Sequence, residues 1–154
     1  LLRQVQSLSQ LVTVKYVVEK VVLLEDVKWY GDNRVLLLAH GIVKAGVDFS
    51  QLKPGDLEVQ GKRILIRLSP AQITDVYLDE AETRVVERET GLLRAFDKNL
   101  EQTARQTALD DIRRAARRGG ILRAAEERAR DQLTGLFRQL GFEEVEVAGA
   151  AMKP

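Results

Sequence analysis

The spacing of apolar residues along this chain changes once, near Gly91, and that change limits the folds open to it. Before Gly91, apolar residues recur mostly at every second position and β-branched residues dominate, as in β-strands. After Gly91, they recur every three or four positions among Ala, Arg, Leu and Glu, as on one face of a helix. We therefore predict an α+β fold, with an antiparallel β-meander, two long amphipathic helices packed on the sheet and a closing C-terminal strand.

Turn residues divide the β part of the chain. The first expected strand alternates, with Val14, Tyr16 and Val18 on one face and Val17 and Glu19 on the other. The sequences YGDN and KPGD predict turns, and GK predicts the turn of a hairpin. These turns lie at residues 30–33, 53–56 and 61–62, and two further strands are expected at about 73–78 and 83–89.

Two apolar stripes define the helices. The first consists of Leu93, Phe96, Leu100, Ala104, Ala108, Ile112 and Ala115, and the second of Leu122, Ala125, Ala129, Leu133, Leu136 and Leu140. Gly120 in the sequence RRGG separates the helices, and Gly141 ends the second, because glycine readily adopts a left-handed cap. We expect one domain over residues 1–154, with a lead-in helix at 1–10, mostly β structure at 11–90, helices at 92–140 and the closing strand at 142–147.

Two glycines interrupt the second long strand, in the sequence HGIVKAGVDFSQL (residues 40–52). Glycine inside a strand marks a bulge, a bend or the close approach of another element. The strand face that includes Gly41 consists mostly of small or β-branched side chains, which suits a helix packed closely against it. Asp48, two residues before Ser50, is expected to accept a hydrogen bond from nearby backbone. We therefore predict a structural role for this segment.

Three stretches of the chain are similar to a family of uncharacterised bacterial domains, domain of unknown function 4230. They are KAGVDFSQL, GKRILIRLSPAQI and GGILRAAEERARDQLTGLFRQLGFEEVEV, and the resemblance covers about residues 11–147. The matching motif residues are Gly46, Asp48, Leu68, Pro70, Gly120, Ile121, Leu122, Ala125, Ala129 and Gly141. Ser69 is inserted where the family often runs Leu straight into Pro. The resemblance implies structural motifs and no known activity, and family members often carry a membrane-spanning helix ahead of this domain.

A weaker likeness concerns the end of the chain. The order of strands, helix, glycine and strand in LFRQLGFEEVEV resembles the membrane-associated domain of stomatins, prohibitins and flotillins. That likeness implies oligomerisation at membranes, although a shared fold alone carries no function.

The composition argues against several kinds of chemistry. The formal net charge is +1, so overall charge does not favour nucleic acid, and the chain has no cysteine for disulfides, thiolate zinc sites or nucleophilic catalysis. His40 is the single histidine, and we interpret it as a half-buried strand residue. The carboxylates of residues 78–82 and 142–147 are interpreted as solvated charges. We therefore expect no catalytic residues, no metal site and no cofactor.

Arginines cluster near the end of the first long helix. Arg113, Arg114, Arg117 and Arg118 could bind an anion such as a phosphate, a lipid headgroup or nucleic acid. Alternatively, they stabilise the C-terminal end of the helix through its macrodipole and keep it soluble. We favour the second interpretation, and the missing aromatic residues between Phe96 and Phe137 argue against single-stranded nucleic acid.

Trp29 and Tyr30 follow the first long strand. Such a pair could face a membrane surface or cover the open end of the sheet, and we favour the second interpretation. The chain also opens on Leu1 rather than Met, which we interpret as a trimmed start that could follow a membrane anchor.

These observations favour a non-enzymatic domain of the cell envelope that forms a homo-oligomer or binds a protein partner. One alternative is an anion-binding module that uses the arginine cluster. Another is a small-molecule-binding domain with a pocket between sheet and helices.

Overall fold

The computed structural model describes residues 12–91, 95 and 97–149. The lead-in helix predicted at residues 1–10 lies outside the described residues, as do Leu93 and Phe96 of the first predicted stripe. The chain divides into two compact units, each described by itself below. The α2 unit consists of residues 15–43 and 75–119, and the α3 unit of the described residues before 15 together with 44–74 and 120–149.

Three long strands contribute residues to both units. They are β1 (Val12–Lys28), β2 (Gly31–Val47) and β5 (Gln72–Leu78). The expectation of a single domain stays a prediction, and a single cooperative unfolding transition would support it.

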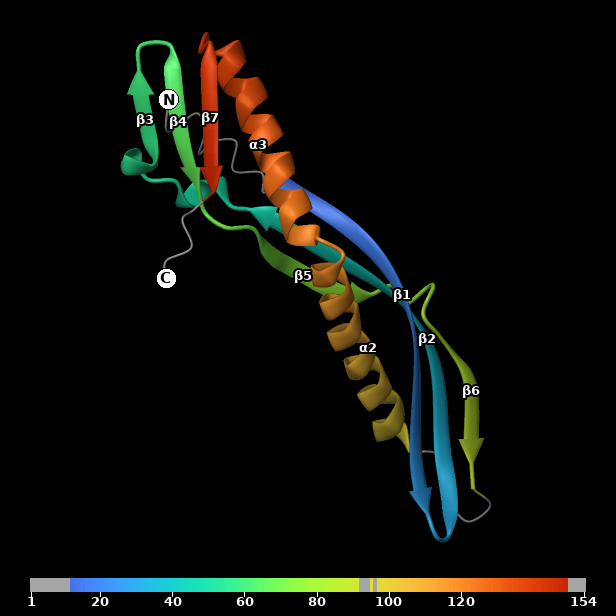
Figure 1. Cartoon of the computed structure of the whole chain (residues 1–154). Helices are drawn as coiled ribbons and strands as arrows, with labels where there is room; N and C mark the ends of the chain where they lie inside the picture. The colour runs from blue at the N-terminus through green and yellow to red at the C-terminus, as the bar shows by residue number, and fades with distance from the viewer. Residues whose placement is uncertain (1–11, 92–94, 96, 150–154) are drawn as a thin grey trace. The chain divides into compact units, whose positions relative to one another are not determined.

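The α2 unit also contains β6 (Arg84–Thr90) and helix α2 (Lys98–Arg118). Its strands belong to a four-stranded sheet of order β1-β2-β5, in which β6 also pairs with β2 (Figure 1). β6 runs antiparallel to β2, from Thr90 opposite Asn33 to Arg84 opposite Leu38, and the register shifts between Leu36 and Leu37 because β6 has one extra residue there, Val86.

The turn between β1 and β2 lies earlier than predicted. β1 ends at Lys28 and β2 begins at Gly31, so the predicted turn residues Asp32 and Asn33 belong to the strand. The backbone N–H of Gly91 donates to the carbonyl of Asp32 at 2.8 Å, which extends the sheet to the start of β2.

Helix α2 packs closely on β2 because Gly41 has no side chain. A Cβ placed on Gly41 would lie 2.5 Å from Cδ1 of Ile112 and 2.7 Å from its Cγ2. The predicted close approach at this glycine is therefore confirmed. The buried residues of α2 are Ala104, Ala108, Ile112 and Ala116. The prediction that Ala115 closes the stripe is wrong, because the buried row continues in four-residue steps to Ala116.

The α3 unit is built on a second, three-stranded sheet of order β3-β4-β7. β3 (Leu57–Gln60) and β4 (Arg63–Leu68) form the predicted antiparallel hairpin, with Gly61 at φ 60° in its turn. β7 (Glu144–Gly149) is the predicted closing strand, but it runs parallel to β4. Parallel strands need a long crossover connection, and helix α3 (Ile121–Gln139) lies in that connection.

The predicted apolar stripe of helix α3 is confirmed at Ala125, Ala129 and Leu133 and is wrong at its two ends. The buried residues are Ile121, Ala125, Ala129, Leu133 and Phe137, whereas Leu140 is 41% exposed. Phe137 is held inside by an edge-to-face contact with Phe142, with ring centroids 5.7 Å apart. Gly120 and Gly141 have φ of 82° and 94°, so both predicted left-handed glycines are confirmed. The α+β fold class is likewise confirmed, with its strands divided between two sheets.

Candidate interaction surfaces

The family motif residues Gly46, Asp48 and Pro70 line one open groove of the α3 unit. Its volume is about 700 Å³, and the other lining residues are Gln51, Lys53, Asp56, Ser69, Gln72 and Thr74. The structure therefore brings together three motif residues that are up to 24 positions apart in the sequence. Gly120, Ala125 and Gly141 instead form the start, the buried face and the end of α3.

The carboxylates of this groove stabilise turns. Oδ1 of Asp48 accepts hydrogen bonds from the backbone N–H of Ser50 at 2.9 Å and from its hydroxyl at 2.6 Å, capping the 3₁₀ turn η1 (Phe49–Gln51). These bonds hold the pKa of Asp48 below its ordinary value. Asp56, in the turn η2 (Pro54–Asp56), accepts from the backbone N–H of Lys53 at 2.8 Å. The hydrogen bond that the sequence predicts between Asp48 and nearby backbone is confirmed.

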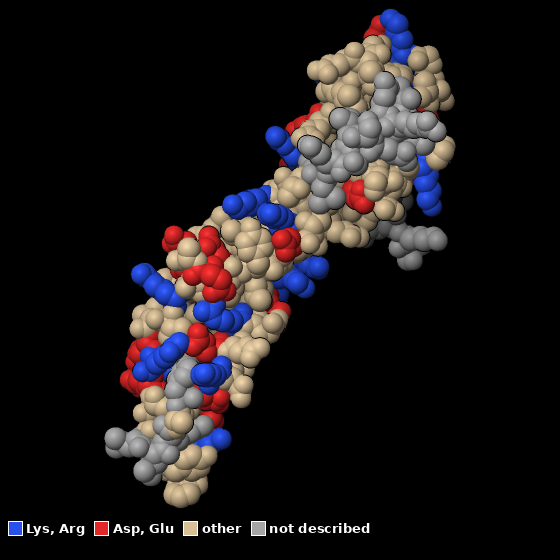
Figure 2. Space-filling model, turned by 180° about the vertical axis from the view of Figure 1, so that it is seen from behind, with Lys and Arg blue, Asp and Glu red and all other residues tan. Residues whose placement is uncertain are grey.

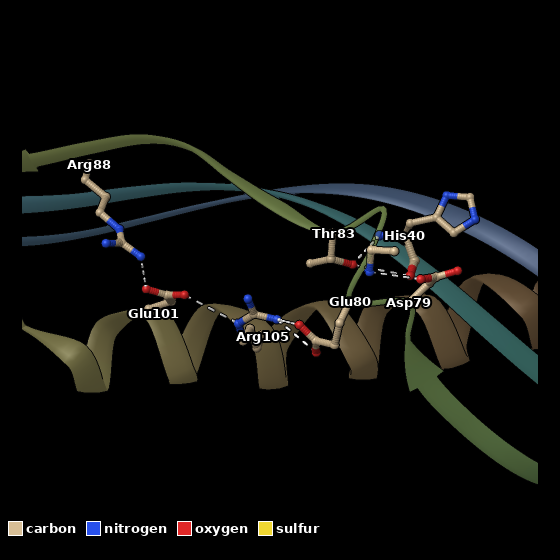
Figure 3. Close-up of polar contacts among 8 residues, drawn as sticks. His40, Asp79, Glu80, Thr83, Arg88, Glu101 and Arg105 are labelled. Atoms are coloured by element: carbon tan, nitrogen blue, oxygen red, sulfur yellow. Dashed lines mark hydrogen bonds and ion pairs between the residues drawn. The ribbon is translucent and has the colours of Figure 1, made fainter.

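His40 is a half-buried strand residue, as predicted. Its side chain is 22% exposed, and its Nδ1 lies 3.4 Å from Oε1 of Glu19 on β1. The backbone of His40 holds the turn between β5 and β6. Its N–H donates to Oγ1 of Thr83 at 3.1 Å, and its carbonyl accepts from the N–H of Asp79 at 2.8 Å (Figure 3).

A chain of ion pairs fixes α2 to the same turn. Arg105 binds Glu80 of the turn at 2.9 Å and lies 3.6 Å from Glu101, which in turn pairs with Arg88 of β6 (Figure 3). Glu80 had been interpreted as a solvated turn charge, and this contact with Arg105 was not foreseen. Partners so distant in sequence leave no local signal in the residues around them.

The arginine cluster is exposed at the C-terminal end of α2. Arg114 pairs with Asp111 one turn earlier, and Arg117 and Arg118 lie in the last turn. The carbonyl end of a helix attracts cations and repels anions, so this position favours the macrodipole interpretation. Figure 2 shows basic and acidic side chains mixed over the face seen from behind. Anion binding by these arginines stays an untested prediction.

The face of β1 that lies opposite to α2 carries exposed aliphatic side chains. Tyr16, at an even-numbered position, lies on the α2 side, where its ring is near Gly119. The odd-numbered positions lie on the other face, which we call the outer face. The exposed fractions there are 53% for Val17, 64% for Val21, 48% for Leu23 and 69% for Val27.

Two carboxylates of the outer face are held by β2. Glu19 contacts His40, and Glu25 accepts from Nε of Arg34 at 2.7 Å. The signal for this surface was present in the sequence VVEKVVLL, in which apolar residues occupy consecutive positions and so fall on both faces. The alternation of β1 is predictable from the sequence, but it does not tell which of the two faces of the strand is exposed.

Trp29 is 95% exposed, so the prediction that it covers the end of the sheet is wrong. Its ring makes an edge-to-face contact with Tyr30, with centroids 5.3 Å apart. These two residues form the turn between β1 and β2.

Among the described residues, no group of three or more histidine and carboxylate side chains is placed to hold a metal ion. Within the part of the chain that the structure describes, no helix is both long enough and apolar enough to span a membrane.

The fold is an α+β domain with two sheets. Helix α2 packs on the first sheet and helix α3 on the second, and the outer face of β1 carries exposed aliphatic side chains. The chain belongs to the DUF4230 family, described as a protein of unknown function, whose sequence model matches residues 3–147. No curated protein and no solved structure matches the chain. The weaker likeness to stomatins, prohibitins and flotillins is not confirmed.

Proposed function

We propose that this domain is a protein-interaction module, not an enzyme, and that it binds its partner through the outer face of β1. The observation that supports the proposal is the row of four large aliphatic side chains, each about half or more exposed, on Val17, Val21, Leu23 and Val27. Antiparallel sheets normally show polar side chains on a solvated face, so an apolar one indicates contact with a partner.

Burial of these four side chains alone does not supply enough free energy for stable binding. Burying one large aliphatic side chain contributes about 1.5–3 kcal/mol. Covering the exposed parts of all four would therefore contribute about 4–7 kcal/mol, which is comparable with the cost of association itself, at about 4 kcal/mol or more. A partner must make additional contacts, and the backbone of a sheet edge can supply them.

Photo-crosslinking in cells that naturally produce the protein tests the proposal. A photoreactive amino acid replaces Leu23, and a matched control replaces Gln106, an exposed residue of α2 in the same unit. We expect identified protein adducts at position 23 and few at position 106. Equal adducts at both positions, or adducts with lipid alone, would contradict the proposal.

We also infer that the domain works at the cell envelope, which is what the family resemblance implies. Fractionation of the same cells tests this inference. Recovery of the protein mainly with the membrane fraction is expected, and recovery entirely in the cytosolic fraction would overturn it.

A further inference from the structure

We propose that the partner is a second copy of this chain, whose β1 pairs antiparallel with β1 so that the two Leu23 residues meet at a two-fold axis. The inference rests on the proposed function and specifies its partner. Three features of the α2 unit support it: the position of β1 in its sheet, the orientation of its charged side chains and the order of charges along it.

β1 is the edge of the four-stranded sheet. Within the described residues, it neighbours β2 alone in the strand order. The strand is 17 residues long, and in any antiparallel ladder alternate backbone groups point away from the neighbouring strand. A second β1 would form backbone hydrogen bonds along this edge, and it would bring side chains of the two outer faces beside each other as cross-strand neighbours.

The carboxylates of the outer face do not oppose this pairing. Glu25 bonds to Arg34 and Glu19 contacts His40, so both side chains lean towards β2 and away from the free edge of β1. The aliphatic residues between them are thus left at the edge. In a pairing centred on Leu23, the two Leu23 side chains would meet, while Val21 would face the stem of Glu25 and Val27 that of Glu19.

The register follows from the charges. When two identical strands pair antiparallel, the two-fold axis passes either through a residue or between two residues. Because side chains alternate, the outer faces of both strands lie on the same side of the sheet only when the axis passes through a residue. The four exposed aliphatic residues are centred between Val21 and Leu23, and among the centres from residue 19 to residue 25 those that place like charges opposite each other are Glu19, Lys20, Val22, Leu24 and Glu25. A centre at Val21 pairs no charges, whereas a centre at Leu23 places Lys20 opposite Asp26 twice. Opposite charges across strands stabilise a sheet and like charges destabilise it.

The same register places Trp29 near Val17 of the second copy. In a pairing centred on Leu23, these two positions face each other on the outer face. Trp29, which is 95% exposed in the single chain, would then cover an exposed valine. The pairing therefore gives this side chain an aliphatic contact in addition to its ring contact with Tyr30.

Disulfide trapping tests the register directly, since the chain has no cysteine of its own. Under mild oxidation, Leu23→Cys should form a covalent dimer, because residues on the two-fold axis have Cα atoms about 4.5–5.5 Å apart. Val27→Cys is the matched control. Its two copies would lie about 27 Å apart at the rise of a strand and should not crosslink.

A charge exchange tests the same pairing without a covalent bond. Sedimentation velocity of the unmodified protein over a range of concentrations should show a monomer–dimer equilibrium. Lys20→Asp should weaken dimerisation about tenfold or more, because it places two Asp residues opposite each other twice. Combining Lys20→Asp with Asp26→Lys should restore the affinity, and circular dichroism should show all variants folded.

Several outcomes would overturn the inference. A protein that stays monomeric with no Leu23→Cys disulfide excludes the second copy, and a disulfide in Val21→Cys but not in Leu23→Cys excludes this register. Binding of monomers to vesicles of phosphatidylglycerol, lost in Trp29→Ser, assigns the surface to lipid instead. Cellular adducts of another protein at position 23 would still support the proposed function.

Discussion

Strands β1 and β4 differ in the side chains of their outward faces. Each strand has one face turned towards the interior of its unit and one face turned outwards. In β4, Ile64, Ile66 and Leu68 are buried, while Arg63 and Arg67 point outwards into ion pairs. Arg63 binds Glu146 of β7 at 3.0 Å, and Arg67 binds Glu58 of β3 at 2.6 Å. In β1, four outward positions hold exposed valine or leucine, and the outward carboxylates Glu19 and Glu25 contact β2.

The two outward faces are suited to different contacts. Charged pairs such as those around β4 stay hydrated and contribute little to stability, at most about 1 kcal/mol each. They also discourage edge-to-edge association, because burying them would remove their water. The outer face of β1 has the opposite property, since covering it with a partner releases water from apolar surface.

The largest expected effect comes from changing the face of β2 that α2 covers, because this contact decides which side of the sheet is outer. Gly41→Val places a side chain where Ile112 already lies, 2.5 Å from the new Cβ. Overpacking of this kind should lower the free energy of unfolding by about 2–3 kcal/mol, measured by urea denaturation. Gly135→Ala in α3, where a Cβ meets nothing within 4 Å, is the control and should raise it by about 0.5–1 kcal/mol.

A second prediction concerns the α3 unit, through the cap formed by Asp48. Asp48→Ala should lower the free energy of unfolding by about 1 kcal/mol at neutral pH, because the turn η1 loses its cap. Hydrogen bonds from Ser50 depress the pKa of Asp48 in the folded protein. The ionised cap is therefore stabilising above the unfolded pKa of about 4 and is lost as pH falls through the folded value. Urea titrations from pH 7 to pH 2 should show the difference between the two proteins shrinking; a constant difference would assign it to something else.

A third prediction concerns a polar outer face of β1, which would resemble the outward face of β4. Val21→Thr combined with Leu23→Thr should change the free energy of unfolding of the monomer by no more than about 0.5–1 kcal/mol, since both side chains are exposed. The same change should abolish dimerisation in sedimentation velocity. If the double variant dimerises as well as the parent protein, the outer face is not the contact surface.

The smallest effect is expected at the arginines of α2. Changing Arg113, Arg114, Arg117 and Arg118 together to Gln should alter the free energy of unfolding by about 0.5 kcal/mol or less, because exposed charges contribute little. Co-sedimentation with anionic vesicles should be the same for this variant and the parent protein. Clear loss of vesicle binding would revive the anion-binding alternative.

Local chemistry made several features predictable from the sequence. The cap at Asp48 depends on residues two positions apart, and Gly120 and Gly141 end helical patterns within their own segments. Gly41 was predictable as a point of close approach because glycine is otherwise unfavourable in a strand. The ion pair of Arg105 with Glu80 was not predictable, since Glu80 lies 25 residues away.

The amino-acid sequence alone determined the type and order of the elements, because the repeat of apolar residues follows the geometry of strand and helix. Only the tertiary structure decided that β7 pairs in parallel with β4, and that the strands form two sheets. It also decided which face of β1 is left uncovered. Alternation tells apart the two faces of a strand, but when both are apolar, only the position of α2 over Gly41 selects the one that water reaches.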